Sequence, residues 1–213
     1  EVALPAEIDF SAAVPFPFDP APGFGGRIAA IVHVYYEDLT KEVQRYLRNI
    51  PYSFDTYICT DTPGKRASIL AAFAGWDRGG INVRLVPNRG RDIAPKLVAF
   101  RDVYDTYEFI LHLHTKSSST ENHLEVFRNW RGFIFENLLG SPEVARSILD
   151  AFARRRDLGM IAAQHFEPVR RHLNWGDNYP IAQALAARMG IALSDERALD
   201  FPSGSMFWAR SAA

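Results

Sequence analysis

Short apolar runs alternate with helical patterns along almost the whole chain, and this alternation constrains the fold more than any other feature. The runs, the first of which is rich in β-branched residues, cover residues 28–34, 54–60, 81–86, 107–114, 158–163 and 204–209. Helical spacing of apolar residues marks the segments between them, at 39–47, around 69–73, at 93–104, at 123–139, from 141 onwards and at 181–189. Alternating strands and helices predict an α/β, Rossmann-like fold with a mostly parallel sheet and helices on both faces.

The length of the chain suits one packed domain. It has 213 residues, of which 47% are hydrophobic. Residues 1–26 are rich in Pro and Gly without a sustained period, so we expect an N-terminal arm or linker there and a single domain over residues 27–213. The chain begins without Met and stops at Ala213, directly after an apolar run, which leaves open that it is an excerpt truncated at its C-terminus.

Composition excludes several classes of protein. The net charge is -1 with both signs mixed along the chain, so no basic footprint for nucleic acid is present. No apolar run reaches the ~20 residues of a membrane span, and the first ten residues do not resemble a secretory signal. We therefore expect a soluble cytoplasmic protein. The run Arg154 to Arg156 reads as a solvated helix end, or alternatively as a peripheral contact with the anionic inner face of the cytoplasmic membrane.

The chain has a single cysteine, Cys59. One cysteine cannot form an internal disulfide, which fits a reducing compartment. Cys59 lies within the apolar run 54–60, so we predict a buried structural thiol rather than a nucleophile.

Polar residues follow each of the first four predicted strands. They are Tyr35, Tyr36 and Glu37 after the first, Thr60 and Asp61 after the second, Asn88, Arg89, Gly90, Arg91 and Asp92 after the third, and His114, Thr115 and Lys116 after the fourth. The carboxyl ends of parallel strands meet at one edge of the sheet, where ligands bind in open α/β folds. We therefore predict a binding site at that edge.

The segment after the third strand suits an anion. Arg89 and Arg91 flank a glycine just before a predicted helix N-terminus, a pattern that suits phosphate oxygens and makes a diphosphate the natural ligand. The alternative is that Asp92 only caps the helix and the arginines are solvated. Lys96 lies one helical turn after Asp92, where it can pair with Asp92 or contact the ligand.

The fourth strand ends in three basic side chains. Alternation along a strand predicts that His112, His114 and Lys116 share one face. We interpret His112 as a buried structural histidine and His114 and Lys116 as ligand contacts. A His-x-His metal site is the alternative, but Lys116 would repel a cation and no nearby carboxylate completes the ligand set, so no metal or other cofactor is expected.

Two further positions have both a binding and a structural interpretation. Asp61 can accept a hydrogen bond from a nucleobase, or can form the turn before Thr62. Trp175 beside Asp177 suits a sugar ring, or the tryptophan can pack into the core.

These residues lie in segments that resemble the rhamnan synthesis F family of bacterial polysaccharide glycosyltransferase domains, from about Arg27 to the chain end. The motifs that carry the likeness are VPNRGRDIAP at 86–95, LHLHTKS at 111–117 and FPSGSMFWAR at 201–210. The resemblance implies a GT-A fold in which Tyr35 and Asp61 face the base, while Arg91, Asp92 and Lys96 face the ribose and diphosphate. From the pattern of the loop itself we add Asn88 and Arg89 to the nucleotide-binding residues. The implied partners are a nucleoside-diphosphate sugar donor, a lipid-linked glycan acceptor and other glycosyltransferase domains of the same polypeptide.

The sequence departs from most GT-A enzymes at one point. Where they place an Asp-x-Asp that holds a divalent ion, this chain has His114, Thr115 and Lys116. Positive side chains can replace the ion's charge, so we expect metal-independent binding. We place the acceptor at Trp175, Asp177 and Ser203, Gly204 and Ser205. The catalytic base is either Asp177 or a residue beyond Ala213.

The leading hypothesis is a glycosyltransferase that transfers a sugar, with rhamnose as one candidate, to a growing bacterial surface polysaccharide such as O-antigen, capsule or rhamnan. A binding module that has kept the fold without catalysis is the first alternative. A metal-dependent hydrolase that uses His112 and His114 is the second.

Overall fold

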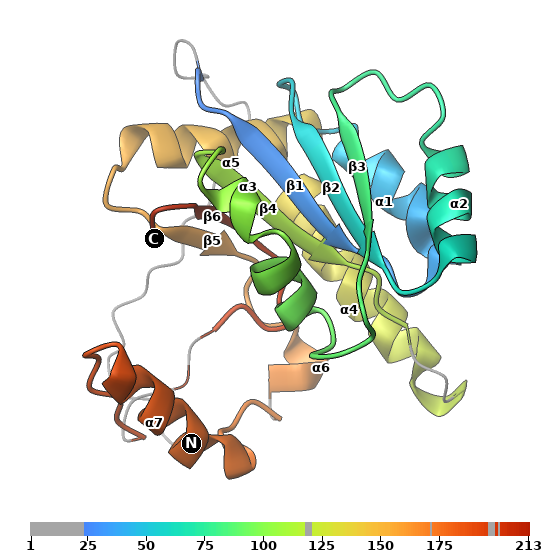
Figure 1. The fold of residues 1–213 in the computed structure, drawn as a ribbon. Coiled ribbons are helices and arrows are strands. Elements are labelled where there is room, and N and C mark those ends of the chain that lie inside the picture. The colour runs from blue at the N-terminus through green and yellow to red at the C-terminus, as the bar shows by residue number, and fades with distance from the viewer. Residues whose placement is uncertain (1–23, 118–120, 171, 196–198, 200) are drawn as a thin grey trace.

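A computed structural model describes residues 24–117, 121–170, 172–195, 199 and 201–213, which include one six-stranded sheet (Figure 1). Its strands are β1 (Ile28–His33), β2 (Asp55–Thr60), β3 (Ile81–Leu85), β4 (Phe109–His114), β5 (Met160–Ala162) and β6 (Phe207–Arg210), in the order β3-β2-β1-β4-β6-β5. Neighbours from β3 to β4 are parallel, whereas β6 is antiparallel to both β4 and β5. The predicted mostly parallel α/β fold is confirmed.

The helices lie close to their predicted positions. They are α1 (Thr40–Leu47), preceded by the 3-10 turn η1 (Glu37–Leu39), α2 (Pro63–Ala72), α3 (Arg101–Tyr104), α4 (Glu121–Leu139), α5 (Pro142–Arg154), α6 (Glu167–Arg170) and α7 (Tyr179–Arg188), which follows the 3-10 turn η3 (Gly176–Asn178). The helix predicted over 93–104 is divided, because its middle is a π-helical segment, η2 (Pro95–Ala99). The predicted start of α5 is confirmed: Ser141 Oγ accepts a hydrogen bond from the amide of Val144, and a proline opens the helix.

Helices cover both faces of the sheet. Ile28, Ala30 and Val32 of β1 pack into a core with residues of α1, α2, α4 and α5. The intervening Ala29 and Ile31 face the opposite side, where residues of α3 and the end of η2 cover them. Because both faces of β1 are buried, the strand is apolar throughout except for its last residue, His33.

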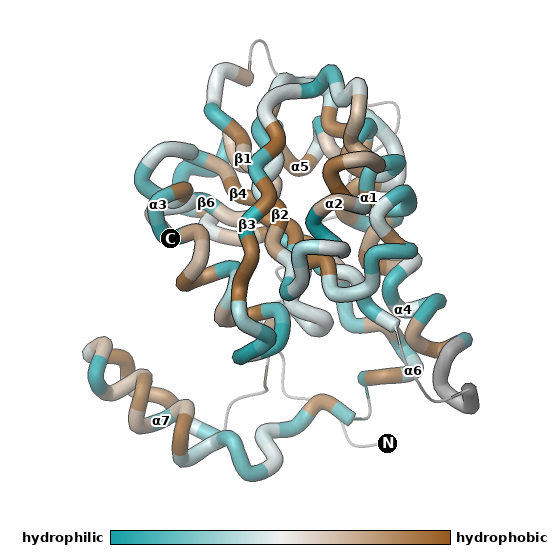
Figure 2. Tube along the Cα trace, turned by 45° about the vertical axis from the view of Figure 1, so that its right-hand side comes forward, coloured by the Kyte–Doolittle hydropathy of each residue, from teal (hydrophilic) through white to brown (hydrophobic). Residues whose placement is uncertain are grey.

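The helical segments on this second face, α3 and η2, do not cover the whole sheet. Met160, on β5, is 44% exposed, and Figures 1 and 2 show α7 apart from the sheet. On α7, Ile181 is 64% exposed and Leu185 is 51% exposed. No helix among the described residues is long and apolar enough to cross a membrane.

The thiol of Cys59 lies in the smaller core. It is fully buried, and burial raises its pKa to about 12. Its sulfur lies 3.2 Å from Nδ1 of His33. The predicted buried structural thiol is confirmed.

Candidate functional site

A buried polar cluster joins three segments at the carboxyl end of β4. Lys96, on η2, is 3% exposed, and its ammonium donates hydrogen bonds to Oδ2 of Asp92 at 3.2 Å and to the carbonyl of Ser205 at 2.5 Å. Nε2 of His114 lies 2.6 Å from the carbonyl of Gly204 and 3.7 Å from Oδ2 of Asp92. The cluster therefore ties η2 and the loop before β6 to the end of β4.

Burial governs the protonation of this cluster. It lowers the pKa of His114 to about 4, although Asp92 and the Gly204 carbonyl act in the opposite direction. Burial also lowers the pKa of Lys96, and Asp92 opposes this. Burial acts to raise the pKa of Asp92, but His114 and Lys96 outweigh it and hold the pKa below its ordinary value. An Asp92–Lys96 ion pair beside a neutral imidazole is the state expected at neutral pH.

Both loops that meet at the cluster have unusual backbone conformations. Arg91 and Ser205 have φ of 52° and 56°, and they are the two non-glycine residues with positive φ in the described part of the chain. Each follows a left-handed glycine, Gly90 with φ of 71° and Gly204 with φ of 87°. A Cβ on Gly90 would collide with Ala94. Such strain, of order 1–3 kcal/mol per residue, is typical of functional sites.

The loop before η2 presents its basic side chains to solvent. Asn88, Arg89 and Arg91 are exposed, and within the described residues neither arginine forms an ion pair. The expected capping role of Asp92 is wrong, because its carboxylate turns to Lys96 while the amides of Ile93 and Ala94 bond to the carbonyl of Gly90. Of the two roles left open for Lys96, the structure shows the pairing with Asp92.

The ends of β1 and β2 bring Tyr35 and Asp61 together through Lys65. The Lys65 ammonium lies 2.8 Å from Oδ1 of Asp61 and 4.1 Å from the centroid of the Tyr35 ring. The amides of Tyr35 and Tyr36 both donate to Oγ1 of Thr115 at 3.0 Å, which fixes the turn after β1 to the end of β4.

Lys116 lies beyond β4 and contacts α4. Because the strand ends at His114, the strict alternation of side chains stops there. The Lys116 ammonium lies 4.1 Å from the ring centroid of Trp130 and 5.3 Å from that of Phe127. Burial lowers the pKa of the Lys116 ammonium below its ordinary value. The charge of Asp92 acts to raise this pKa, and that of Arg91 acts to lower it. Lys116 is thus electrostatically coupled to the same loop as Arg91.

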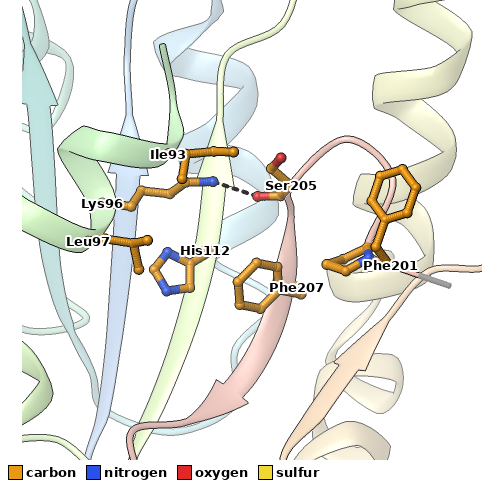
Figure 3. Close-up of a pocket in the computed structure, with 8 residues that line it drawn as sticks. Ile93, Lys96, Leu97, His112, Phe201, Ser205 and Phe207 are labelled. Carbon is orange, nitrogen blue, oxygen red and sulfur yellow. Dashed lines mark hydrogen bonds between the residues drawn. The ribbon is translucent and has the colours of Figure 1, made fainter. Parts of the chain in front are cut away.

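A pocket of about 220 Å³ opens beside Lys96, between η2 and β6 (Figure 3). Its walls are Ile93, Lys96, Leu97, His112, Phe201, Pro202, Ser205 and Phe207. His112 is 2% exposed, as predicted for a buried histidine, and its Nε2 lies 2.9 Å from the Tyr104 hydroxyl. Burial, with a smaller contribution from Lys96, lowers its pKa to about 3. Its Nδ1 has no hydrogen-bond partner among the described residues.

Comparison with known proteins decides the family. Residues 23–213 match the model of the family described as rhamnan synthesis protein F. The chain belongs to this family. It is also 32% identical over 184 residues to the uncharacterized protein WxcX from two strains of Xanthomonas campestris pv. campestris, a match that covers 84% of this chain and 25% of each relative. The chain thus spans about a quarter of the length of these relatives.

Solved structures were also compared with this member of the rhamnan synthesis protein F family, and one of those found to be similar is a mannosyltransferase. It is the mannosyltransferase PcManGT from Pyrobaculum calidifontis in complex with GDP-Man and Mn²⁺. The TM-score is 0.36 with 16% sequence identity, over 47% of this chain and 30% of that chain.

The three motifs on which the rhamnan synthesis F resemblance rests converge at the site. The first contributes Arg91 and Asp92 and ends directly before Lys96, the second contributes His112 and His114, and the third contributes the loop and strand from Ser203 to Phe207. Segments far apart in the sequence therefore meet around one cluster and one pocket.

The proposed acceptor residues are divided between two places. Ser203, Gly204 and Ser205 lie at the cluster, where Ser203 is buried. Trp175 instead contacts Tyr179 at the start of α7, with ring centroids 5.5 Å apart, and Asp177 is exposed in η3. Because α7 lies apart from the sheet in both views, the structure does not bring Trp175 and Asp177 together with the Ser203–Ser205 loop.

Sequence reasoning missed several residues of the site. His33 ends β1 directly beside His114 in the register of the two strands, and it is the one polar residue in the run 28–34, a signal that could have been used. Leu97 and Phe207 line the pocket, but no local pattern distinguishes them from the other apolar residues of the predicted helix 93–104 and strand 204–209. Within the described ranges, no group of three His, Cys, Asp or Glu side chains is arranged to hold a metal ion.

Proposed function

We propose that this domain binds a nucleoside-diphosphate sugar at the carboxyl ends of β1, β2, β3 and β4, and that it transfers the sugar to a bacterial surface polysaccharide. The observation that carries the proposal is the strained loop at Gly90 and Arg91, which presents exposed guanidinium groups next to a buried, internally neutralised cluster. Membership of the rhamnan synthesis protein F family supports a role in polysaccharide synthesis.

We assign different residues to the different parts of the nucleotide-sugar donor. Tyr35 and Asp61, joined by Lys65, form the side that takes the base. Arg89, Arg91 and Lys116, with Asn88, are the groups available to the diphosphate, since guanidinium and ammonium groups form charge-assisted hydrogen bonds to phosphate. Lys96 and His114 are held by Asp92, Gly204 and Ser205, so we assign them as positioning residues.

Further features of the donor and acceptor are part of the same proposal. Rhamnose is a candidate sugar, and the acceptor is a lipid-linked glycan reached from the cytoplasmic side. Because the chain spans a quarter of its relatives, other domains of the same polypeptide are proposed to act with it. Asp92 is engaged by Lys96, and Asp177 lies in η3, which the structure does not bring to the Ser203–Ser205 loop, so neither carboxylate is assigned as the catalytic base.

The charge on the departing nucleoside diphosphate is proposed to be balanced by protein cations. Lys116 occupies the place where the resemblance leads one to expect a metal-holding carboxylate, and it is electrostatically coupled to Arg91 and Asp92. Fixed cations in a partly buried site stabilise developing negative charge without reorganisation.

Replacing Arg91 tests the proposal. Arg91→Ala should weaken binding of the preferred nucleoside diphosphate among UDP, GDP and dTDP by roughly 1.5–3 kcal/mol, as expected for loss of a charged hydrogen bond. Calorimetry measures the change, and Arg101→Ala, an exposed arginine on α3, is the matched control. If the wild-type chain binds none of the three nucleotides, the proposal fails. Binding without release of nucleoside diphosphate from a sugar donor would favour the non-catalytic module.

A further inference from the structure

We propose that the pocket between η2 and β6 is the subsite for the donor sugar and that its walls select an uncharged sugar with an apolar edge. This inference rests on the proposed function, because it assumes that a nucleoside diphosphate binds at the adjoining strand ends. It adds a location for the sugar and the residues that determine which sugar is accepted.

The order of the strands gives the first argument. Across the sheet, β2, β1, β4 and β6 are successive neighbours. Tyr35 and Asp61 follow β1 and β2, Lys116 and the cluster lie at β4, and the pocket lies between η2 and β6. An extended nucleotide sugar has its base, diphosphate and sugar in the same order. A donor whose base lies over β1 and β2 therefore extends its sugar towards β6.

Continuity between the cluster and the pocket gives the second argument. Lys96 and Ser205 line the pocket, and the hydrogen bond between them belongs to the cluster that supports the diphosphate loop (Figure 3). The strained residues Arg91 and Ser205 thus belong to the two loops that border the proposed diphosphate and sugar positions. A ligand bound by Arg91 would have its next group at the mouth of this pocket.

The chemistry of the walls defines the class of sugar. Five of the lining side chains are apolar: Ile93, Leu97, Phe201, Pro202 and Phe207. At about 220 Å³ the pocket is smaller than the roughly 300–1,000 Å³ that hold drug-sized ligands, which suits one sugar ring. Hydroxyl groups buried without partners are unfavourable and an unpaired carboxylate is more so. The walls therefore favour a neutral sugar that has few hydroxyls on its buried edge.

His112 adds an aromatic ring with two nitrogens to this wall. Nε2 of His112 and the Tyr104 hydroxyl form a hydrogen bond of 2.9 Å, in which either group can be the donor according to the tautomer of the ring. Nδ1 is buried and has no hydrogen-bond partner within the described residues, so the ring has unused hydrogen-bonding capacity behind the pocket wall. Figure 3 shows the imidazole between Leu97 and Phe207. The ring centroids of His112 and Phe207 are 4.7 Å apart.

The test fills the pocket without adding charge. Leu97 is 54% exposed, so Leu97→Trp can occupy the pocket without disturbing the core, and Val98→Trp, at a 75% exposed neighbour that does not line the pocket, is the matched control. Calorimetry compares UDP, GDP and dTDP with UDP-glucose, GDP-mannose and dTDP-glucose. We expect Leu97→Trp to weaken binding of the sugar nucleotide at least tenfold while the nucleoside diphosphate changes less than threefold. Val98→Trp should change neither.

The possible outcomes separate the two proposals. If wild type binds no nucleoside diphosphate, the proposed function is wrong, and the proposal of a sugar subsite, which depends on it, is wrong as well. If wild type binds both forms and Leu97→Trp affects both equally, or neither, the subsite alone is overturned. For the nucleotide that binds, the uronate form of its sugar should bind at least tenfold more weakly than the neutral hexose form. Equal affinity would overturn the selection for an uncharged sugar.

Discussion

Single residues on one face of β4 determine how the site responds to pH. His112 and His114 are both almost completely buried beside Lys96, and their pKa values fall to about 3 and about 4. Each ring is therefore neutral in the folded protein and becomes protonated on unfolding when the pH is below the ordinary value of 6.5. Both histidines contribute stability near neutral pH that acid removes.

Replacing His112 should change the pH dependence of stability. Between pH 6.5 and about 3 the unfolded chain binds a proton at this position that the folded chain does not, so the free energy of unfolding falls as the pH falls, by about 1.4 kcal/mol per pH unit for one imidazole. His112→Phe, which keeps the ring, should make the decline shallower by this amount. Urea unfolding at pH 7, 6 and 5 measures it. An unchanged slope would show that His112 is protonated in the folded state.

Lys116 is expected to contribute more to nucleoside-diphosphate affinity than any divalent ion does. Lys116→Met should weaken binding of the nucleoside diphosphate about tenfold or more, because a partly buried ammonium beside phosphate is lost. Treatment of wild type with EDTA should leave its affinity unchanged. A titration with and without EDTA compares the two. The charge-substitution argument is wrong if EDTA abolishes binding while Lys116→Met preserves it.

At the scale of elements, the contact between η2 and the loop before β6 holds the site together. One ammonium, that of Lys96, bonds to Asp92 before η2 and to the carbonyl of Ser205 before β6. The division of the predicted helix 93–104 into Ile93–Ala94, the π-helical η2 and α3 coincides with this contact. Such π-helical insertions are frequent at functional sites.

Removing the ammonium should loosen this contact. Lys96→Met should lower the free energy of unfolding by roughly 3 kcal/mol, since it leaves the Asp92 carboxylate and the Ser205 carbonyl without a partner. Lys96→Met combined with Asp92→Asn should lose less than the sum of the two single variants, because the double variant leaves no unpaired charge. Chemical denaturation measures all four proteins. Strict additivity would show that the two side chains do not interact.

At the scale of the whole molecule, the core lies mainly between the sheet and the helices α1, α4 and α5. Leu149 on α5 is fully buried there, whereas Leu185 on α7 is 51% exposed. The same residue type therefore occupies two very different environments in one chain.

A pair of matched substitutions should show this difference. Leu149→Ala should lower the free energy of unfolding by roughly 2–5 kcal/mol, because it leaves a cavity in the core. Leu185→Ala should change it by about 0.5 kcal/mol or less, because α7 contributes little to that core. Thermal and urea unfolding compare the variants. A loss of several kcal/mol for Leu185→Ala would show that α7 packs against the domain in solution.

Much of the fold could be predicted from the sequence because its signals are local. Periods of two and 3.6 residues located the strands and most helices, and the Ser141-Pro142 start of α5 followed from backbone chemistry. The family resemblance is also a property of the chain read in order, and the match over residues 23–213 confirms it. The strand ends brought Asp92 and His114 together as expected, because parallel strands share one edge.

Only the tertiary structure showed which distant groups the side chains of the site contact. The sequence could not show that Lys96 bonds to the Ser205 carbonyl 109 positions away, or that Lys116 leaves the face of His114 to contact Trp130. Nor could the sequence show that Trp175 contacts the start of α7 and not the Ser203–Ser205 loop. It also could not show that Leu97 and Phe207 line the same pocket. Side-chain periodicity specifies which face a residue occupies within an element. Which distant group it meets depends on how the elements pack, and burial then sets the charge of His112, His114 and Lys96.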